Sequence, residues 1–319
     1  MGAYPRVVGS SPRRQQALLL FNSSASRVGL VPAGEAGDQA GVLDMSAFSG
    51  DGRWVVARKG LAELMGTALL LFLGCMGGVG GLSESPPPHL QVALTFGLVV
   101  GIIIQIIGHI TDAHLNPAVT AAAVILDRMT LPVSAVYVLS QLAGGVLGYG
   151  MLLVVTPRSA LEAAAPNGSR CALCVTLPHA ELSAPQAVLA EALVTAVLIL
   201  VVCSVWDPRN AANTDSVPLK FGFTVAAIAA AEGPYTGASM NPARSLGPVI
   251  WTGVWSYHWV YWVGPMLGAV VAAYTYKLVW GVPAPRGPAE VTEESLPLRD
   301  VRNSKEVEAR ASATNLSSA

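Results

Sequence analysis

The chain alternates long apolar stretches with short polar connections. Six stretches are long and apolar enough to cross a bilayer core about 30 Å thick, and they cover residues 61–80, 90–110, 132–155, 186–206, 218–232 and 257–280. The fifth is the shortest, and we expect its helix to extend back through Val217. Glycine and other small residues recur within these stretches, which favours close packing of helices in a membrane.

Two further apolar runs, 118–126 and 243–251, are too short to cross. Each follows Asn-Pro, at Asn116-Pro117 and Asn241-Pro242. Asparagine is a good N-cap, and proline at the first helical position loses no hydrogen bond. A bilayer crossing needs roughly twenty residues. The pattern therefore predicts two half-helices that enter the membrane without crossing it.

Composition supports a membrane protein. The mean hydropathy is +0.51, with 52% hydrophobic and 12% charged residues, which is far from a typical soluble domain. The net charge of -1 gives no electrostatic basis for binding nucleic acid. The predicted fold class is therefore an all-α membrane protein with six transmembrane helices and two half-helices.

The distribution of lysine and arginine predicts the orientation. If both termini are cytoplasmic, sixteen of the nineteen basic residues lie on the cytoplasmic side, as the positive-inside rule expects. Residues 1–59 and 282–319 are then disordered cytoplasmic tails, and 156–185 is an outer loop. Asn167 in that loop begins a glycosylation sequon, whereas the sequons at Asn22 and Asn315 would face the cytoplasm. We expect the plasma membrane as the location.

The channel domain expected over 60–281 consists of two halves, 60–155 and 186–281, that resemble each other. Residues 62–71 match 190–199, Phe96-Gly97 matches Phe221-Gly222, and Asn116-Pro117-Ala118 matches Asn241-Pro242-Ala243. The last two pairs share one offset of 125 residues. Because each half has three crossings, the second enters the membrane upside down. Such an inverted repeat brings the N-termini of the two half-helices together near the midplane.

The four cysteines do not suggest a disulfide framework or a metal site. Cys75 and Cys203 lie in apolar spans, where a buried thiol is expected. Cys171 and Cys174 lie in a polar loop, where they could pair, bind a ligand or remain free. The sequence shows no nucleophile–base pair and no metal-ligand cluster, so an enzyme is not expected, nor is a cofactor.

The paired Asn-Pro-Ala motifs, taken with several neighbouring segments, resemble the aquaporin (major intrinsic protein) family. The resemblance covers residues 60–280 and includes, besides the paired Asn-Pro-Ala motifs, Gly108-His109-Ile110, His114 to Thr120, Asn241 to Ser245 and Tyr261 to Pro265. The segment 72–78 further resembles insect members of the family, and the filter residues described below fit insect glycerol-permeable aquaporins of water-channel ancestry. The resemblance implies a homotetramer with one pore in each subunit.

Two helix N-termini that face each other would repel cations, since each carries roughly half a positive charge. In the family, the asparagines at the positions of Asn116 and Asn241 orient the passing molecule and interrupt proton transfer. Glu63 and Glu191 lie inside spans, where a carboxylate is unfavourable. They could form ion pairs or be protonated. The favoured interpretation, which the family shares, is that they accept hydrogen bonds from non-helical backbone at the half-helix entrances.

The resemblance places a selectivity filter at Phe96, Ala229, Ala238 and Arg244. Water-selective relatives have histidine where this chain has Ala229, so the opening is expected to be wider and more apolar. This arrangement suits a polyol, with its carbon edge against Phe96 and Ala229 and its hydroxyls toward Arg244. The glycerol-facilitator branch, however, has aspartate at the position of Ser245 and tends to have tryptophan at that of Phe96.

We therefore expect a passive channel for water and small uncharged solutes such as glycerol, with urea as a further candidate, that excludes ions and protons. One alternative is a mainly water-selective pore, if neighbouring side chains fill the space beside Ala229. Another is an adhesion or scaffold protein with a vestigial pore. His109 and His114 are expected to bond loop backbone near the first half-helix rather than to sense pH.

Overall fold

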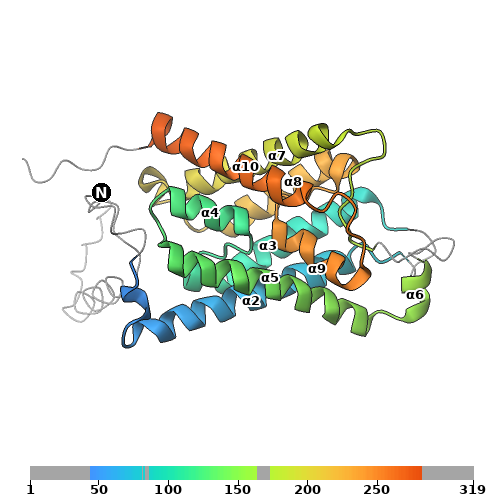
Figure 1. Ribbon diagram of the computed structural model, residues 1–319, viewed down its shortest axis with the longest axis horizontal. Helices are drawn as coiled ribbons and strands as arrows, with labels where there is room; N and C mark the ends of the chain where they lie inside the picture. The colour runs from blue at the N-terminus through green and yellow to red at the C-terminus, as the bar shows by residue number, and fades with distance from the viewer. Residues whose placement is uncertain (1–43, 81, 83–85, 164–172, 282–319) are drawn as a thin grey trace, which may run out of the picture. The chain divides into compact units, whose positions relative to one another are not determined.

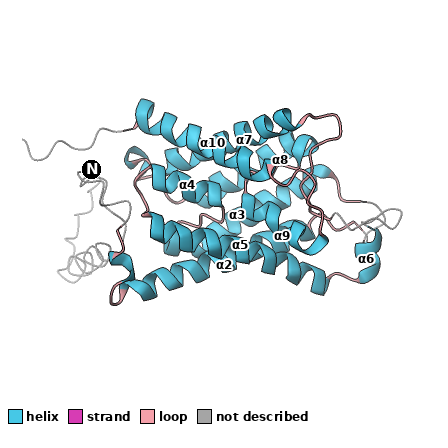
Figure 2. Cartoon of the chain, viewed as in Figure 1, coloured by secondary structure: helices cyan, strands magenta, loops and turns pink. Residues whose placement is uncertain are grey.

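A computed structural model describes residues 44–80, 82, 86–163 and 173–281. The regular elements in these ranges are all helices (Figure 2), and they belong to one compact unit. Six long helices are α2 (Gly52–Met76), α3 (His89–Thr111), α5 (Leu131–Val155), α7 (Ala184–Trp206), α8 (Val217–Thr236) and α10 (Val260–Thr275). Two short helices begin at the Asn-Pro motifs, α4 (Pro117–Ile125) and α9 (Pro242–Thr252). Minor elements are α6 (Arg158–Ala163), η2 (Ser46–Phe48), η4 (Pro208–Asn210) and the π-helix η5 (Tyr276–Trp280).

The predicted all-helical fold class is confirmed, and the eight expected helices correspond to observed ones. Among the described residues, α2, α3, α5 and α7 are long and apolar enough to cross a membrane. Helix α8 is less apolar, since it contains Lys220 and Glu232. Helix α10 is regular for only 16 residues before it continues as η5. Both helices have the positions of crossing helices in the repeat, but α8 is less apolar than the four and α10 is apolar but shorter.

Helix α2 begins at Gly52, seven residues before the expected end of the N-terminal tail at residue 59. This first part of the helix contains Arg53, Arg58 and Lys59. Such residues are too polar for a bilayer core, so hydropathy excluded them from the predicted span. A helix can nevertheless continue beyond the apolar core, because its backbone hydrogen bonds do not depend on the side chains.

The two halves interlock through their short helices (Figure 1). Helix α2 packs on α5 in the first half, and α7 packs on α10 in the second. Helices α3 and α8 join the halves. Helix α9 of the second half packs on α5 of the first, whereas α4 packs on α10. Figure 1 shows α4 and α9 in opposite parts of the bundle. Each half-helix is therefore held largely by the other half.

Glycines lie where the long helices cross most closely. A Cβ atom at Gly148 of α5 would overlap the carbonyl of Ala68 in α2. A Cβ atom at Gly268 of α10 would overlap the carbonyl of Ala192 in α7, which is the equivalent contact of the second half. Because lipid tails provide no hydrophobic force between helices, such close backbone approach is a main source of bundle stability.

Large apolar side chains face outward. On α3, every fourth residue forms an exposed stripe, and its members are Leu90, Leu94, Leu98, Ile102, Ile106 and Ile110. The opposite face of α3 buries Val99, Ile103 and Ile107. An exposed apolar stripe of this length is unfavourable in water but is suited to a lipid or protein environment. The arrangement agrees with a helix embedded in a membrane.

We expect Gly148→Ala to destabilise the bundle. The added methyl group would force α5 away from the Ala68 carbonyl of α2, and overpacking of this kind costs about 1–3 kcal/mol. The melting temperature of the purified protein in detergent should fall. The matched control is Gly108→Ala in α3, where the nearest atom would lie 3.4 Å away and helix propensity improves. Equal melting temperatures for the two variants would contradict the proposed packing role.

Candidate functional site

The N-termini of α4 and α9 meet through reciprocal hydrogen bonds. Asn116 Nδ2 donates to the Met240 carbonyl at 2.8 Å, and Asn241 Nδ2 donates to the Leu115 carbonyl at 2.8 Å. Each asparagine also caps its own helix, because its Oδ1 accepts from the backbone N–H of Ala118 or Ala243. Proline follows at the first helical position in both helices. A single side chain thus caps one half-helix and joins it to the other half.

The segment before each half-helix has the same unusual backbone. Positive φ angles occur at Asp112 (61°), Ala113 (49°) and Leu115 (56°) in the first half. Their counterparts, 125 positions later, are Gly237 (90°), Ala238 (49°) and Met240 (52°). A non-glycine residue in this region costs on the order of 1–3 kcal/mol and persists only where its surroundings hold it. The repeat seen in the sequence therefore extends to a strained backbone conformation that both halves share.

Two buried carboxylates hold these segments. Glu63 Oε1 accepts from the His114 N–H at 3.0 Å, and its Oε2 accepts from the Leu115 N–H at 2.7 Å. Gln141 Nε2 also donates to Glu63 Oε2, at 2.8 Å. Glu63 has no exposed surface, and neither has its counterpart Glu191 in the second half.

In the second half, Glu191 Oε1 accepts from the Ser239 N–H at 2.9 Å, and Oε2 accepts from the Met240 N–H at 2.8 Å. Thr236 Oγ1 donates to Glu191 Oε1 at 2.6 Å. Each carboxylate thus satisfies two successive backbone donors that no helix can satisfy, in a region where unpaired donors are costly.

Other contacts repeat between the halves. The Tyr261 hydroxyl donates to the Thr236 carbonyl at 2.8 Å, and Tyr137 makes the equivalent bond to Thr111 at 3.4 Å. The Ser239 and Ser245 hydroxyls lie 2.6 Å apart, where the first half has a pair formed by His114 and Thr120.

The prediction that the His114 side chain bonds loop backbone was wrong. The ring contacts the Thr120 hydroxyl at 3.1 Å rather than loop backbone, and it packs against Tyr137 and Trp206. Sequence proximity suggested loop backbone, but α4 brings a hydroxyl closer. His109, by contrast, is exposed and lines the cavity described next.

A cavity of about 870 Å³ runs through the described part of the molecule. Its walls come from both halves. They include the asparagines of the two Asn-Pro-Ala motifs and the four predicted filter residues, namely Asn116, Asn241, Phe96, Ala229, Ala238 and Arg244. His109 and His114 also line it. Apolar surface makes up the larger part of the wall, and its polar side chains include Asp112 and Asp215 besides the histidines, the two asparagines and Arg244.

Phe96 and Arg244 face each other in this wall. The Arg244 guanidinium lies 4.8 Å from the centre of the Phe96 ring, and its Nη1 donates to the Cys174 carbonyl at 2.7 Å. The Phe96 ring packs directly on Gly74 of α2, where a Cβ atom would lie 2.5 Å from Phe96 Cε1. Arg244 is 92% buried, since only 8% of its surface is exposed. A buried cation is thus placed beside an aromatic ring at the cavity wall.

Ala229 presents only a methyl group on the α8 side of the cavity. It packs with Ala93, Leu198 and Ala238. One turn further along α8, His89 of α3 occupies the space over Gly233, and its Nε2 lies 3.1 Å from the Ala230 carbonyl. His89 lines the same cavity, although no motif in the sequence indicated it.

The expectation for Cys75 was wrong. Cys75 at the end of α2 forms a disulfide with Cys174, which is 99 residues away in the loop before α7. Cys203 is free and buried, as expected. Burial in an apolar span suggested a thiol, but the end of α2 lies against the returning loop. Cys171 and Asn167 lie outside the described residues.

An all-helical bundle with an outward apolar surface, and with two half-helices whose N-termini meet beside an internal cavity, is the architecture of a membrane channel. The chain belongs to the major intrinsic protein family, whose model matches residues 52–276. This family comprises integral membrane channels rather than enzymes.

Similar proteins support this assignment. Mouse aquaporin-4 is 36% identical over 239 residues, which cover 74% of this chain and 71% of that protein. Rat aquaporin-2 is 38% identical over 221 residues, covering 69% and 78%. Among solved structures, the aquaglyceroporin from Plasmodium falciparum matches with a TM-score of 0.60 and 25% identity, covering 70% of this chain and 97% of that one.

We expect Glu191→Gln to destabilise the segment before α9. Glutamine has one acceptor oxygen, so its amide group would face either the Ser239 or the Met240 N–H and leave it unpaired. An unpaired buried donor costs about 1–3 kcal/mol. The melting temperature in detergent should fall, whereas exposed Glu181→Gln should leave it unchanged. An unaltered melting temperature for Glu191→Gln would show that the carboxylate does not hold this segment.

Proposed function

We propose that the protein is a passive membrane channel for water and small uncharged solutes such as glycerol, with urea as a further candidate, and that it excludes ions and protons. The observation that carries the proposal is the small side chain of Ala229 in a cavity wall that also contains Phe96, Ala238 and Arg244. We place the channel in residues 60–281.

Exclusion of cations and protons follows from the two half-helices. Their N-termini direct partial positive charge at the cavity, in a region of low dielectric constant. Asn116 and Asn241 each use one amide hydrogen to join the halves. The second amide hydrogen can donate to the oxygen of a passing molecule. A water molecule held in this way directs its own hydrogens away from the centre, which interrupts the chain of hydrogen bonds that a proton would follow.

Passage of glycerol follows from the filter. Phe96 and Ala229 supply apolar surface, and Arg244 supplies fixed hydrogen-bond donors. A polyol has one face of carbon and one of hydroxyl groups, so it can satisfy both surfaces at once. The similarity to a solved aquaglyceroporin agrees with this proposal. Because the solute moves down its own gradient, no cofactor is needed.

The proposal predicts that Ala229→His removes glycerol conduction and keeps water conduction. An imidazole would narrow the opening and replace its apolar side with a polar edge. Water and glycerol permeability are measured in one preparation of proteoliposomes by stopped-flow light scattering. We expect glycerol permeability to fall at least tenfold, equivalent to about 1.4 kcal/mol. The size control is Ala229→Gly, which should conduct glycerol at least as well as the original protein. Unchanged glycerol flow through Ala229→His would refute the filter assignment.

His89 supports a second candidate function, a mainly water-selective pore. Its imidazole lies one turn of α8 from Ala229 and lines the same cavity, so it could narrow the passage that Ala229 widens. Under this alternative, the original protein conducts little glycerol and His89→Ala raises glycerol permeability strongly. Under the favoured proposal, glycerol already passes and His89→Ala changes its permeability little.

We further propose a homotetramer in the plasma membrane, with both termini cytoplasmic. The disulfide between Cys75 and Cys174 supports an extracellular position for the loop 156–185, since disulfides persist in oxidising compartments. An epitope tag at either terminus should bind antibody only after cells are permeabilised. Glycosylation at Asn167, detected as a mass shift that Asn167→Gln abolishes, would independently indicate an outer loop.

A further inference from the structure

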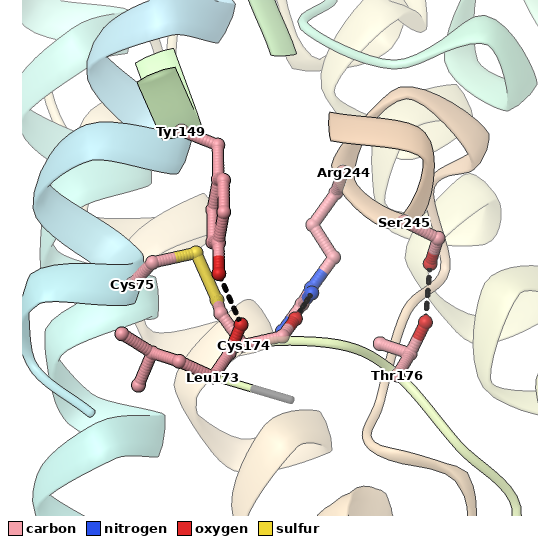
Figure 3. The surroundings of a disulfide bond; sticks show 7 residues. All are labelled: Cys75, Tyr149, Leu173, Cys174, Thr176, Arg244 and Ser245. Carbon is pink, nitrogen blue, oxygen red and sulfur yellow. Dashed lines mark hydrogen bonds between the residues drawn. A yellow bond between two sulfur atoms is a disulfide. The ribbon is translucent and has the colours of Figure 1, made fainter. Parts of the chain in front are cut away.

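The Cys75–Cys174 disulfide lies directly behind two residues of the cavity wall, since Cys174 contacts Arg244 and Gly74, next to Cys75, contacts Phe96. Cys75 is the penultimate residue of α2 and is 1% exposed. Cys174 belongs to the loop that returns toward α7, and its carbonyl oxygen accepts from Arg244 Nη1 at 2.7 Å. Figure 3 shows the guanidinium directed at this carbonyl. The acceptor of Arg244 is therefore part of a residue that is covalently attached to α2.

The same turn of α2 also supports the opposite side of the filter. The Phe96 ring packs on Gly74, which precedes Cys75 in the chain. The contacts therefore form a closed circuit. Phe96 contacts Gly74, and the neighbouring Cys75 is bonded to Cys174. The Cys174 carbonyl binds Arg244, whose guanidinium lies 4.8 Å from the centre of the Phe96 ring. A closed circuit of this kind determines the distance between the ring and the guanidinium.

Weaker contacts hold the rest of the loop. The Tyr149 hydroxyl donates to the Leu173 carbonyl at 2.8 Å, and the Thr176 and Ser245 hydroxyls lie 2.7 Å apart (Figure 3). These bonds hold the residues on either side of Cys174 and would remain without the disulfide. The disulfide is the covalent attachment of Cys174 itself to the helix that seats Phe96. Cys174 also has a positive φ of 62°, a conformation that its surroundings must maintain.

We propose that the Cys75–Cys174 disulfide is a positioning element of the selectivity filter, which holds the Cys174 carbonyl in place and thereby fixes Arg244 against the Phe96 ring. The inference rests on the proposed function of these two residues. Without the covalent link, the carbonyl shifts and Arg244 loses its fixed acceptor. Glycerol is larger than water and needs hydroxyl contacts to the guanidinium, so its passage depends more strongly on the position of Arg244. Water is smaller and can pass beside a displaced side chain.

The experiment uses the full chain in proteoliposomes, before and after treatment with a trialkylphosphine. The phosphine takes an oxygen atom from water while the disulfide accepts two electrons and two protons to give two thiols. Reduction is verified by mass spectrometry after alkylation of the new thiols. We expect the ratio of glycerol to water permeability to fall about threefold, equivalent to about 0.7 kcal/mol, and to recover on reoxidation.

Two controls isolate the disulfide. The background Cys171→Ser/Cys203→Ser retains only Cys75 and Cys174 and should show the same response. In this background, the further change Cys174→Ser should give the low ratio permanently and make it insensitive to phosphine. Reductant acts on protein that is already folded, so a folding defect of Cys174→Ser would not remove the test.

Arg244→Ala tests whether the disulfide acts through Arg244. If it does, reduction should leave the permeability ratio of Arg244→Ala unchanged, because the two perturbations are not additive. The same change of ratio in Arg244→Ala would overturn the proposal. An unchanged ratio of glycerol to water permeability in the original chain, with both new thiols verified, would also overturn it. A proportional fall of both permeabilities would overturn it too, because it would indicate a general loss of structure.

A second measurement separates this inference from the proposed glycerol function. Phenylglyoxal modifies guanidinium groups, and its reaction at Arg244 is followed by mass spectrometry of the peptide. Release from the Cys174 carbonyl should make the reaction at least about threefold faster after reduction. If the unreduced protein conducts no glycerol, the proposed function fails, yet this rate still tests the positioning of Arg244. An unchanged rate would overturn the positioning role.

Discussion

The structure depends on one constraint, that backbone donors and acceptors inside a membrane must find partners within the protein. The chain leaves helical geometry twice at depth, before α4 and before α9, and exposes successive N–H groups there. Glu63 and Glu191 accept these N–H groups, and Asn116 and Asn241 donate to carbonyls of the opposite half. Irregular backbone is stable at these two places because four side chains satisfy it.

These four side chains also determine the character of the cavity. Since each asparagine caps its own helix and bonds the other half, the two positive helix ends are held together. The carboxylates are fully buried and engaged with backbone, so their charge does not line the passage freely. The wall combines a larger apolar part with polar groups that include the amides of Asn116 and Asn241 and the Arg244 guanidinium. A neutral, hydrogen-bonding solute such as water is compatible with such a wall.

Much of this could be predicted because the signals are local or repeated. A long apolar stretch predicts a crossing helix, and Asn-Pro before a short apolar run predicts a capped half-helix; α3, α4 and α9 begin and end close to the expected positions. The 125-residue offset indicated that Asn116 and Asn241 are equivalent. The extension of α2 back to Gly52 was missed, because hydropathy reports burial in lipid rather than helical conformation. The ring of His114 bonds Thr120 because α4 places that hydroxyl next to it.

The disulfide and His89 lie beyond what any pattern along the chain could show. Cys75 and Cys174 are 99 residues apart, and His89 meets Gly233 and Ala230 across two helices. The sequence by itself determined which segments are helical, that the chain is a doubled channel architecture, and which side chains carry the polar chemistry, because hydropathy, capping and repetition act between near or equivalent neighbours. Only the tertiary structure decided which of those side chains meet at the filter and what holds them there, because such contacts depend on how closely the packed helices bring distant residues together.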